Sequence, residues 1–284
     1  MGPRHFVSAF VCAALPMLMP VVTGAATITV PDSLDDFEAQ HRSDSGLYIA
    51  SENFATGSRV GFQSNFNGTG AAAPGGITSL YFFQLPVVAP TEAVSAARFS
   101  VGKQPDTAAT AVAPAFNGDL YALGVVSAVS KTADDAQKFF YLGNTAQSAL
   151  PAGGPTVGGT VSRLADNFLT PADFIAAGGT ASATPNTADL TSYIQNLYAN
   201  PAANGFTLGA SYLVLRLNPD ADTIPTTGTQ RYTTSFHGTA ANGGAGTPEN
   251  RPLIIIETTV VPEPAAAGLL LVGALGVLRR RRSA

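Results

Sequence analysis

The residues best suited to hold a metal ion lie in one short polar segment. Asn218, Asp220 and Asp222 alternate along the chain directly after an apolar run. Three oxygen-bearing side chains at this spacing could converge on Ca²⁺. The segment lacks a glycine at the sixth position, however, and Thr229 stands where a calcium loop needs a bidentate glutamate. A polar turn that satisfies its own backbone is the interpretation we prefer, so we expect no metal.

Paired acids and histidines are the natural candidates for acid–base catalysis, but their spacing argues against it. Asp35-Asp36 and Asp134-Asp135 could be imagined as the two carboxylates of a glycosidase. Adjacent residues rarely face each other across a substrate, and the pair at Asp134-Asp135 suits the first turn of a helix. His41 and His237 lie far apart and lack the spacing of metal ligands.

The short motifs of the common enzyme classes are missing as well. The chain has no Gly-x-Ser-x-Gly elbow, no His-Glu-x-x-His and no Gly-Lys-Ser/Thr phosphate loop, and its single cysteine is Cys12. We therefore expect no enzymatic activity and no cofactor. A hydrolase with an unfamiliar site stays as an alternative.

Tyrosines are the remaining candidates, because sugar rings stack on aromatic side chains and the chain has no tryptophan. Most of them lie within apolar stretches, so we prefer packing in the core as their role. The eight are Tyr48, Tyr81, Tyr121, Tyr141, Tyr193, Tyr198, Tyr212 and Tyr232.

Strands must position these residues, since short runs of β-forming residues recur between clusters of Gly, Pro, Asn and Ser. The runs predict strands at 47–50, 59–62, 79–85, 96–101, 119–125, 212–217, 231–236 and 253–258. Helices are predicted at 133–142, 170–177 and 188–198.

Three of these runs carry apolar residues on both alternating sets. Those at 81–85 and 213–217 are typical of strands in the middle of a packed sandwich, and 253–256 predicts a closing central strand. Residues 27–258 show neither a second composition regime nor a repeat. They predict one all-β domain, an antiparallel β-sandwich with a few short helical insertions.

The N-terminus has the pattern of a secretory signal peptide. Arg4 and His5 precede an apolar stretch at 6–22, and small residues follow. We expect residues 1–26 to be removed by cleavage after Ala25 or Ala26. Cys12 would leave with the signal, so the exported domain must be stable without disulfides.

The C-terminus combines a short motif, an apolar run and a basic end. Pro262-Glu263-Pro264 closes a linker at 259–264, residues 265–278 carry no charge, and Arg279-Arg280-Arg281-Arg282 follow. A helix of fourteen residues spans only ~21 Å of a hydrocarbon core ~30 Å thick, which makes the run a marginal permanent anchor. The arginines favour the cytoplasmic face, so everything before the run should lie outside.

This tail resembles the PEP-CTERM sorting signal of Gram-negative bacteria that make extracellular polysaccharide. The resemblance implies that Pro262, Glu263 and Pro264 are recognised by exosortase, a membrane-embedded cysteine protease. It also implies that residues 265–284 form a hydrophobic helix with a basic tail, which holds the protein in the inner membrane until the protease releases or transfers it.

A second resemblance covers roughly residues 46–258. The segment at 189–194, Gly205 and the closing Asn250-Arg251-Pro252 are similar to motifs of DNRLRE-type carbohydrate-binding modules. Residues 80–85 and 93–99 resemble a hairpin of that family, with Phe82 and Gln84 in place of its usual Arg and Asp. The resemblance implies a jelly-roll sandwich and contact with polysaccharide, and it assigns no binding residue.

Charge removes nucleic acid from the list of partners. Without Arg4 and the four terminal arginines 10 basic residues remain, and without Glu263 18 acidic ones remain, so the body carries a net charge of about −8. Such a surface has no basic patch to displace counterions. We expect an exported, non-enzymatic protein of the cell surface or extracellular matrix, with a polysaccharide-binding module as the first alternative.

Overall fold

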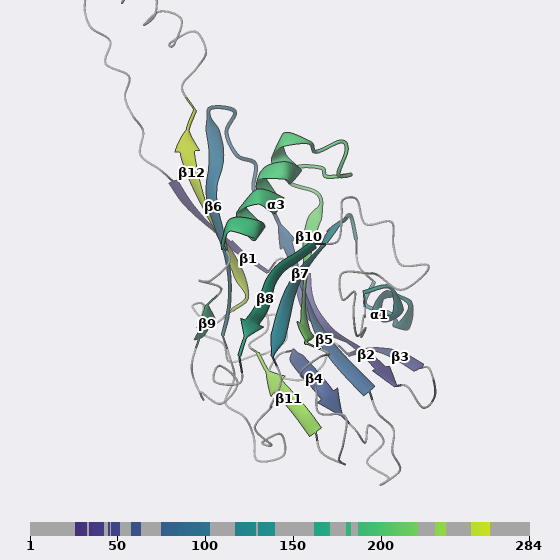
Figure 1. Cartoon of the computed structure of the whole chain (residues 1–284). Helices are drawn as coiled ribbons and strands as arrows, with labels where there is room; N and C mark the ends of the chain where they lie inside the picture. The colour runs from purple at the N-terminus through teal and green to yellow at the C-terminus, as the bar shows by residue number, and fades with distance from the viewer. Residues whose placement is uncertain are drawn as a thin grey trace, which may run out of the picture.

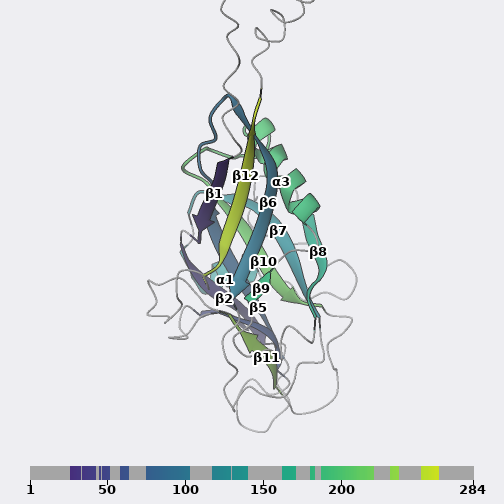
Figure 2. The ribbon, with the colours of Figure 1, turned by 90° about the vertical axis from the view of Figure 1, so that its left-hand side faces the viewer.

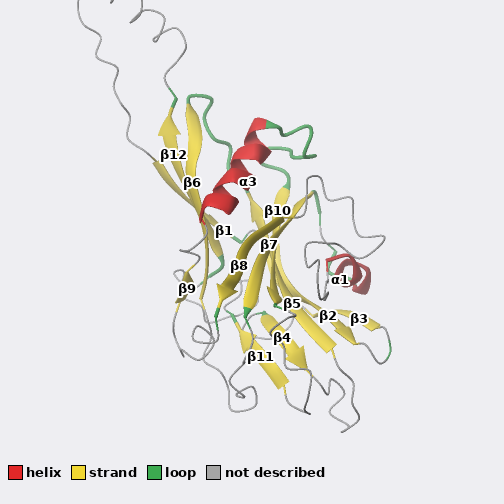
Figure 3. Ribbon diagram, viewed as in Figure 1, coloured by secondary structure: helices red, strands yellow, loops and turns green. Residues whose placement is uncertain are grey.

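The computed structural model shows an all-β architecture of antiparallel strands (Figure 1). It describes residues 26–32, 34–42, 45, 47–51, 58–63, 75–102, 117–128, 130–139, 162–170, 180–182, 187–220, 231–236 and 251–261. Within these ranges two helices accompany the strands, α1 (Ala133–Phe139) and α3 (Thr187–Ala199). Figure 3 shows them on different flanks, with α3 beside β6 and α1 beside β2 and β3.

The strands form two sheets. The smaller has the order β1 (Ala26–Pro31), β12 (Leu253–Val260), β6 (Glu92–Gly102) and β9 (Thr180–Ser182). The larger holds β2 (Leu34–Arg42), β3 (Leu47–Ser51), β4 (Arg59–Gln63), β5 (Gly75–Gln84), β7 (Gly118–Val126), β8 (Ser162–Leu169), β10 (Tyr212–Pro219) and β11 (Arg231–Ser235).

Strand β5 organises the larger sheet. It pairs with β2 along one edge, while β4 and then β10 pair with successive parts of its other edge. Strands β7 and β8 continue the sheet beyond β10, β11 continues it beyond β4, and β3 adds to β2.

An inner core lies between the two sheets. Phe99 of β6 packs against Tyr81 and Phe83 of β5 and against Phe168 of β8, with ring centroids 5.4, 5.9 and 5.6 Å apart. These contacts join the sheets face to face, which makes the fold a β-sandwich. Because truncation of a buried phenylalanine to alanine costs ~3–5 kcal/mol, Phe99 is a main anchor of the sandwich.

A second, outer core lies on the opposite face of the larger sheet. Phe37 of β2, Phe82 of β5 and Phe139 of α1 meet there, with ring centroids 5.7 to 6.2 Å apart. The fully buried Arg216 fixes the end of α1, since its Nη1 donates to the Phe139 carbonyl at 2.9 Å. Its guanidinium also lies 5.2 Å from the ring centroid of Tyr121.

The two cores explain why β5 and β10 are apolar on both alternating sets. Side chains of a strand point to opposite faces in turn, and here each face meets a core. The prediction that these strands lie in the middle of the sandwich is confirmed. Strand β12 lies between β1 and β6, as predicted for the closing central strand (Figure 2).

Helix α3 covers the edge of the inner core beside β6. Leu190, Ile194 and Leu197 are buried in that core, in agreement with their helical spacing. The Ala97 N–H donates to Thr191 Oγ1 at 2.8 Å, which ties the helix to β6. The chain then turns at Gly205, whose φ of 62° favours a residue without Cβ.

All eight predicted strands are confirmed, whereas β1, β2, β8 and β9 were missed. The helices expected at 133–142 and 188–198 are confirmed over 133–139 and 187–199. The third expected helix begins at Thr170, which is exposed and not helical, and its remaining residues 171–177 lie outside the described ranges.

One further expectation is wrong. The segments 80–85 and 93–99 do not form a hairpin, because β5 and β6 belong to different sheets. The connection at 85–91 contains Pro86 and Pro90 and carries the chain across the end of the sandwich. The two strands face each other through Phe83 and Phe99 instead of pairing edge to edge.

Candidate functional site

The beginning of β1 and the end of β12 lie at one end of the sandwich, here called the exit end (Figures 1 and 2). Ala26 of β1 pairs with Thr258 of β12, and the register runs antiparallel from there. The Val261 N–H donates to the Thr91 carbonyl at 2.7 Å and so holds the last described residue against the turn before β6. The expected signal peptide and sorting tail therefore both join the fold at this end.

A groove opens at the exit end between α3 and the start of β6. It has a volume of about 440 Å³, within the ~300–1,000 Å³ usual for ligand pockets. Most of the side chains that line it are apolar, and Glu92, Gln195 and Tyr198 are the exceptions. The lining residues are Val88, Ala89, Pro90, Glu92, Ala93, Val94, Gln195, Tyr198, Ala199 and Leu208.

Hydrogen bonds to backbone carbonyls hold the walls of the groove. Tyr198 Oη donates to the Pro86 carbonyl at 2.6 Å, and Gln195 Nε2 donates to the Val94 carbonyl at 2.8 Å. The Tyr198 ring packs edge-on against Phe206 at 5.8 Å. Burial raises the pKa of Tyr198, so its hydroxyl stays protonated and keeps this bond.

The surface around the groove is free of charge over two long loops. Residues 85–91 and 199–212 contain no Asp, Glu, Lys or Arg. Val87, Leu208 and Val261 are 67, 40 and 45% exposed, and they are three of the four large exposed hydrophobic residues in the described parts of the chain. Sequence reasoning missed this surface, although the lack of charge in both loops was a visible signal.

The structure describes two of the three candidate calcium ligands. Asn218 is buried at the end of β10 opposite Asp119 of β7, and Asp220 follows it, whereas Asp222 lies outside the described residues. Among the residues that the structure describes, no group of three or more His, Cys, Asp or Glu side chains could hold a metal ion. The segment is tied to its neighbours by backbone, as the Asp220 N–H donates to the Asn117 carbonyl at 2.7 Å.

Near this segment, the carboxyl group of Asp119 has a clearly raised pKa. Its Oδ1 accepts the Asn167 N–H at 2.9 Å, and its Oδ2 accepts the Tyr121 hydroxyl at 3.3 Å. Burial raises the pKa of Asp119 to about 6, and the charges of Asp220 and Asp166 add to the rise. Asn167 has a φ of 54°, so Asp119 holds a residue of β8 in the left-handed region. With a side chain only 1% exposed, Asp119 is placed for a structural role.

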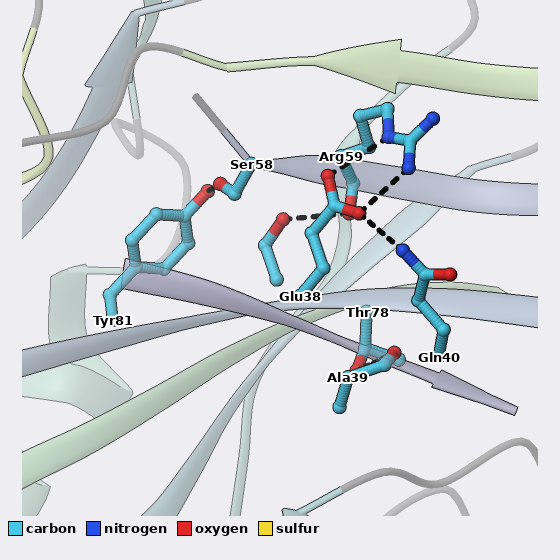
Figure 4. A network of polar contacts seen from close by, with 8 residues as sticks. Glu38, Ala39, Gln40, Ser58, Arg59, Thr78 and Tyr81 are labelled. Carbon is cyan, nitrogen blue, oxygen red and sulfur yellow. Dashed lines mark hydrogen bonds and ion pairs between the residues drawn. The ribbon is translucent and has the colours of Figure 1, made fainter. Parts of the chain in front are cut away.

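A second polar cluster joins β2, β4 and β5 (Figure 4). Glu38 accepts hydrogen bonds from Arg59 Nε at 2.9 Å, Arg59 Nη2 at 3.0 Å and Gln40 Nε2 at 2.8 Å. Ser79 Oγ donates to the Arg59 carbonyl at 2.8 Å, and Ser58 Oγ lies 3.1 Å from Tyr81 Oη. Burial raises the pKa of Glu38, and Arg59 opposes the rise.

Of the other acids and histidines named from the sequence, the structure describes the side chains of Asp134, Asp135 and His41. Asp35 and Asp36 lie in β2, and their side chains are outside the described set. Asp134-Asp135 lie in the first turn of α1, as predicted, and Asp135 Oδ2 accepts the Ser130 N–H at 2.8 Å. The ring centroids of His41 and Tyr48 lie 4.5 Å apart, and His237 is outside the described residues.

The tyrosines divide into buried and partly exposed groups. Tyr81 and Tyr121 are fully buried and belong to the two cores, which confirms the packing role for these two. Partly exposed are Tyr48, Tyr193, Tyr198 and Tyr212. Tyr141 and the side chain of Tyr232 lie outside what the structure describes.

Of the expected processing residues the structure describes only Ala26, the first residue of β1. Ala25, Pro262, Glu263, Pro264 and Arg279 to Arg282 lie outside the described ranges. Neither α1 nor α3 is long and apolar enough to cross a membrane. No model of a known protein family matches this chain, and no curated protein is significantly similar to it.

Proposed function

We propose that this chain is an exported, non-enzymatic protein of the cell surface or extracellular matrix, delivered by a PEP-CTERM-type tail and processed by an exosortase-type protease. One observation carries the proposal. Strand β12 is central in its sheet and ends at Val260, before Pro262-Glu263-Pro264 begins.

Removal of the tail would leave the core intact. The last residue of the inner core is Ile256, and Thr258 is the last buried residue of β12. Val261 is half exposed at the exit end. A protease that cuts near residues 262–264 would therefore leave all the described residues of the core on one side of the cut, as a detachable sorting tail requires.

The path of the chain supports a jelly-roll-like arrangement as part of the same proposal. It passes from the small sheet at β1 to the large one at β2–β5, returns at β6, and crosses again at β7, β9, β10 and β12. Repeated crossing between two antiparallel sheets is typical of jelly rolls. Before processing, the inner membrane would hold the tail with the sandwich outside.

Mass spectrometry of the protein collected from the cell surface tests the processing step. We expect an N-terminus at Ala26 or Thr27 and a C-terminus close to residues 262–264. A variant with Pro262→Ala, Glu263→Ala and Pro264→Ala should keep its tail and stay in the membrane fraction. A surface form of the native protein that still carries Arg279 to Arg282 would contradict the proposal.

One observation favours polysaccharide binding as a second candidate function. The partly exposed His41 and Tyr48 pack together on β2 and β3, 4.5 Å apart, and such a pair suits the face of a sugar ring. In a pull-down with the polysaccharide of the host, Tyr48→Ala should lose most of the bound protein, while Leu208→Ala should lose none. Equal binding by both variants would refute this site.

A further inference from the structure

The exit end presents an aliphatic surface beside the point where the tail leaves. Val87 and the loop around Gly209 lie side by side, since Gln84 Nε2 donates to the Gly209 carbonyl and a Cβ added to Gly209 would lie 3.8 Å from Val87 Cγ2. Leu208 belongs to the same loop and lines the groove. Val261 is held to Thr91, next to Pro90 and Glu92 of the groove. We call the three exposed side chains around the groove, Val87, Leu208 and Val261, the aliphatic rim.

Charged groups are sparse around the aliphatic rim. Among the described residues that line the groove, Glu92 is the charged one, and its Oε2 lies 3.2 Å from Thr258 Oγ1. Bringing this end against an apolar phase would therefore desolvate few charges, and isolated buried charges are what make such contacts unfavourable.

The length of the connection limits how far this end can stand from a membrane. Only Pro262, Glu263 and Pro264 separate Val261 from the uncharged run at 265–278. Four extended residue steps reach at most ~14 Å. The interfacial layer of one leaflet is roughly 5–8 Å thick, so an inserted run would hold the exit end at the headgroups.

We infer that the aliphatic rim docks on the surface of a phospholipid bilayer while the tail is inserted. This inference rests on the proposed membrane insertion of residues 265–278. Val87 and Leu208 enter the boundary between headgroups and acyl chains, where burial of aliphatic surface is favourable. The contact orients the sandwich and holds residues 262–264 at a constant height, within reach of a membrane-embedded protease.

Labels on single cysteines test the inference in the exported form that begins at Ala26 and keeps the tail, which has no native cysteine. A polarity-sensitive fluorophore is placed at Val87→Cys, Leu208→Cys, Ala274→Cys or Leu47→Cys, and the proteins are reconstituted into phosphatidylcholine vesicles with brominated acyl chains. Leu47 is the matched control, because it is a leucine of similar exposure, 48% against 40% for Leu208, on β3. We expect strong quenching at positions 274, 208 and 87, and unchanged emission at position 47.

The outcomes separate this inference from the proposed function. Quenching at 274 alone would show an inserted tail with a free exit end, which overturns the docking and leaves the proposed function standing. Lack of quenching at 274 would overturn both. Quenching at 47 as strong as at 208 would show unspecific adsorption and would also overturn the docking. Because the rim lacks basic residues, anionic lipid should not increase the quenching at 208.

Discussion

Two buried carboxyl groups of the larger sheet are held in different ways. Glu38 and Asp119 are each 1% exposed. Glu38 receives two hydrogen bonds from the Arg59 guanidinium, whereas Asp119 receives its bonds from the Asn167 N–H and the Tyr121 hydroxyl and lies near other acids. The first arrangement depends on a partner of opposite charge, whereas the second relies on neutral donors, and burial raises the pKa of Asp119.

The largest effect is expected when Arg59 is removed. Arg59→Met should lower the free energy of unfolding by ~3–5 kcal/mol, because Glu38 is left in the interior without its charged partner. Urea denaturation of both proteins measures the loss. The double variant Glu38→Leu with Arg59→Met should recover most of it, since a buried ion pair can be replaced by apolar residues. If Arg59→Met is as stable as the native protein, the pair is not needed.

The second effect is a pH dependence that belongs to Asp119. Its pKa is raised from 3.8 to about 6, so the folded state binds more protons than the unfolded state between these values. Stability contributed by the protonated form is present below pH 4 and is lost as the pH rises to about 6, by up to ~3 kcal/mol.

Comparison with Asp119→Asn isolates this group. The amide keeps an oxygen for the Asn167 N–H and does not titrate, so its free energy of unfolding should change less between pH 4 and 6.5 than that of the native protein. Burial lowers the pKa of His41, which acts in the opposite direction, but His41 is present in both proteins and cancels. Parallel pH profiles would show that Asp119 does not carry the effect.

A smaller effect is expected at the start of α1. Asp135 Oδ2 accepts the Ser130 N–H, and the Asp135 N–H donates to Thr132 Oγ1 at 3.3 Å. This carboxylate is held by neutral donors, as Asp119 is, but at a helix N-terminus that favours its charge. Asp135→Ala should destabilise the protein by about 1 kcal/mol in thermal unfolding. A loss as large as that of Arg59→Met would remove the distinction between a carboxylate at a helix N-terminus and one paired with an arginine.

The smallest effect is expected for the exposed pair of Arg98 and Glu257. Their side chains are 41 and 42% exposed and 3.0 Å apart. Arg98→Met should change the free energy of unfolding by less than about 1 kcal/mol, and salt should abolish the difference. This variant is also the matched control for Arg59→Met, because both remove an arginine that is paired with a glutamate across strands.

Local patterns were sufficient for the eight predicted strands, because their apolar residues face a core directly. They failed for β2, in which Glu38 and Gln40 have the character of surface residues. These side chains are buried because Arg59 of β4 lies against them, 21 residues along the chain from Glu38. A single strand carries no sign of such a partner.

The groove could not be predicted from local patterns either. Residues 88–94, 195–199 and Leu208 are distant in sequence and meet because α3 packs on β6. The calcium candidate shows the converse case. Asn218 and Asp220 were close in sequence, and folding placed Asn218 in the interior opposite Asp119.

The sequence by itself determined the all-β class, the positions of most strands and the motifs at both ends, because alternation, turn residues and charge act locally. Only the tertiary structure decided which strands face each other, which polar groups are buried and what surrounds the exit of the chain. These properties depend on contacts between residues far apart in the chain. Such contacts form when apolar faces of separate elements are buried together, and no local spacing records them.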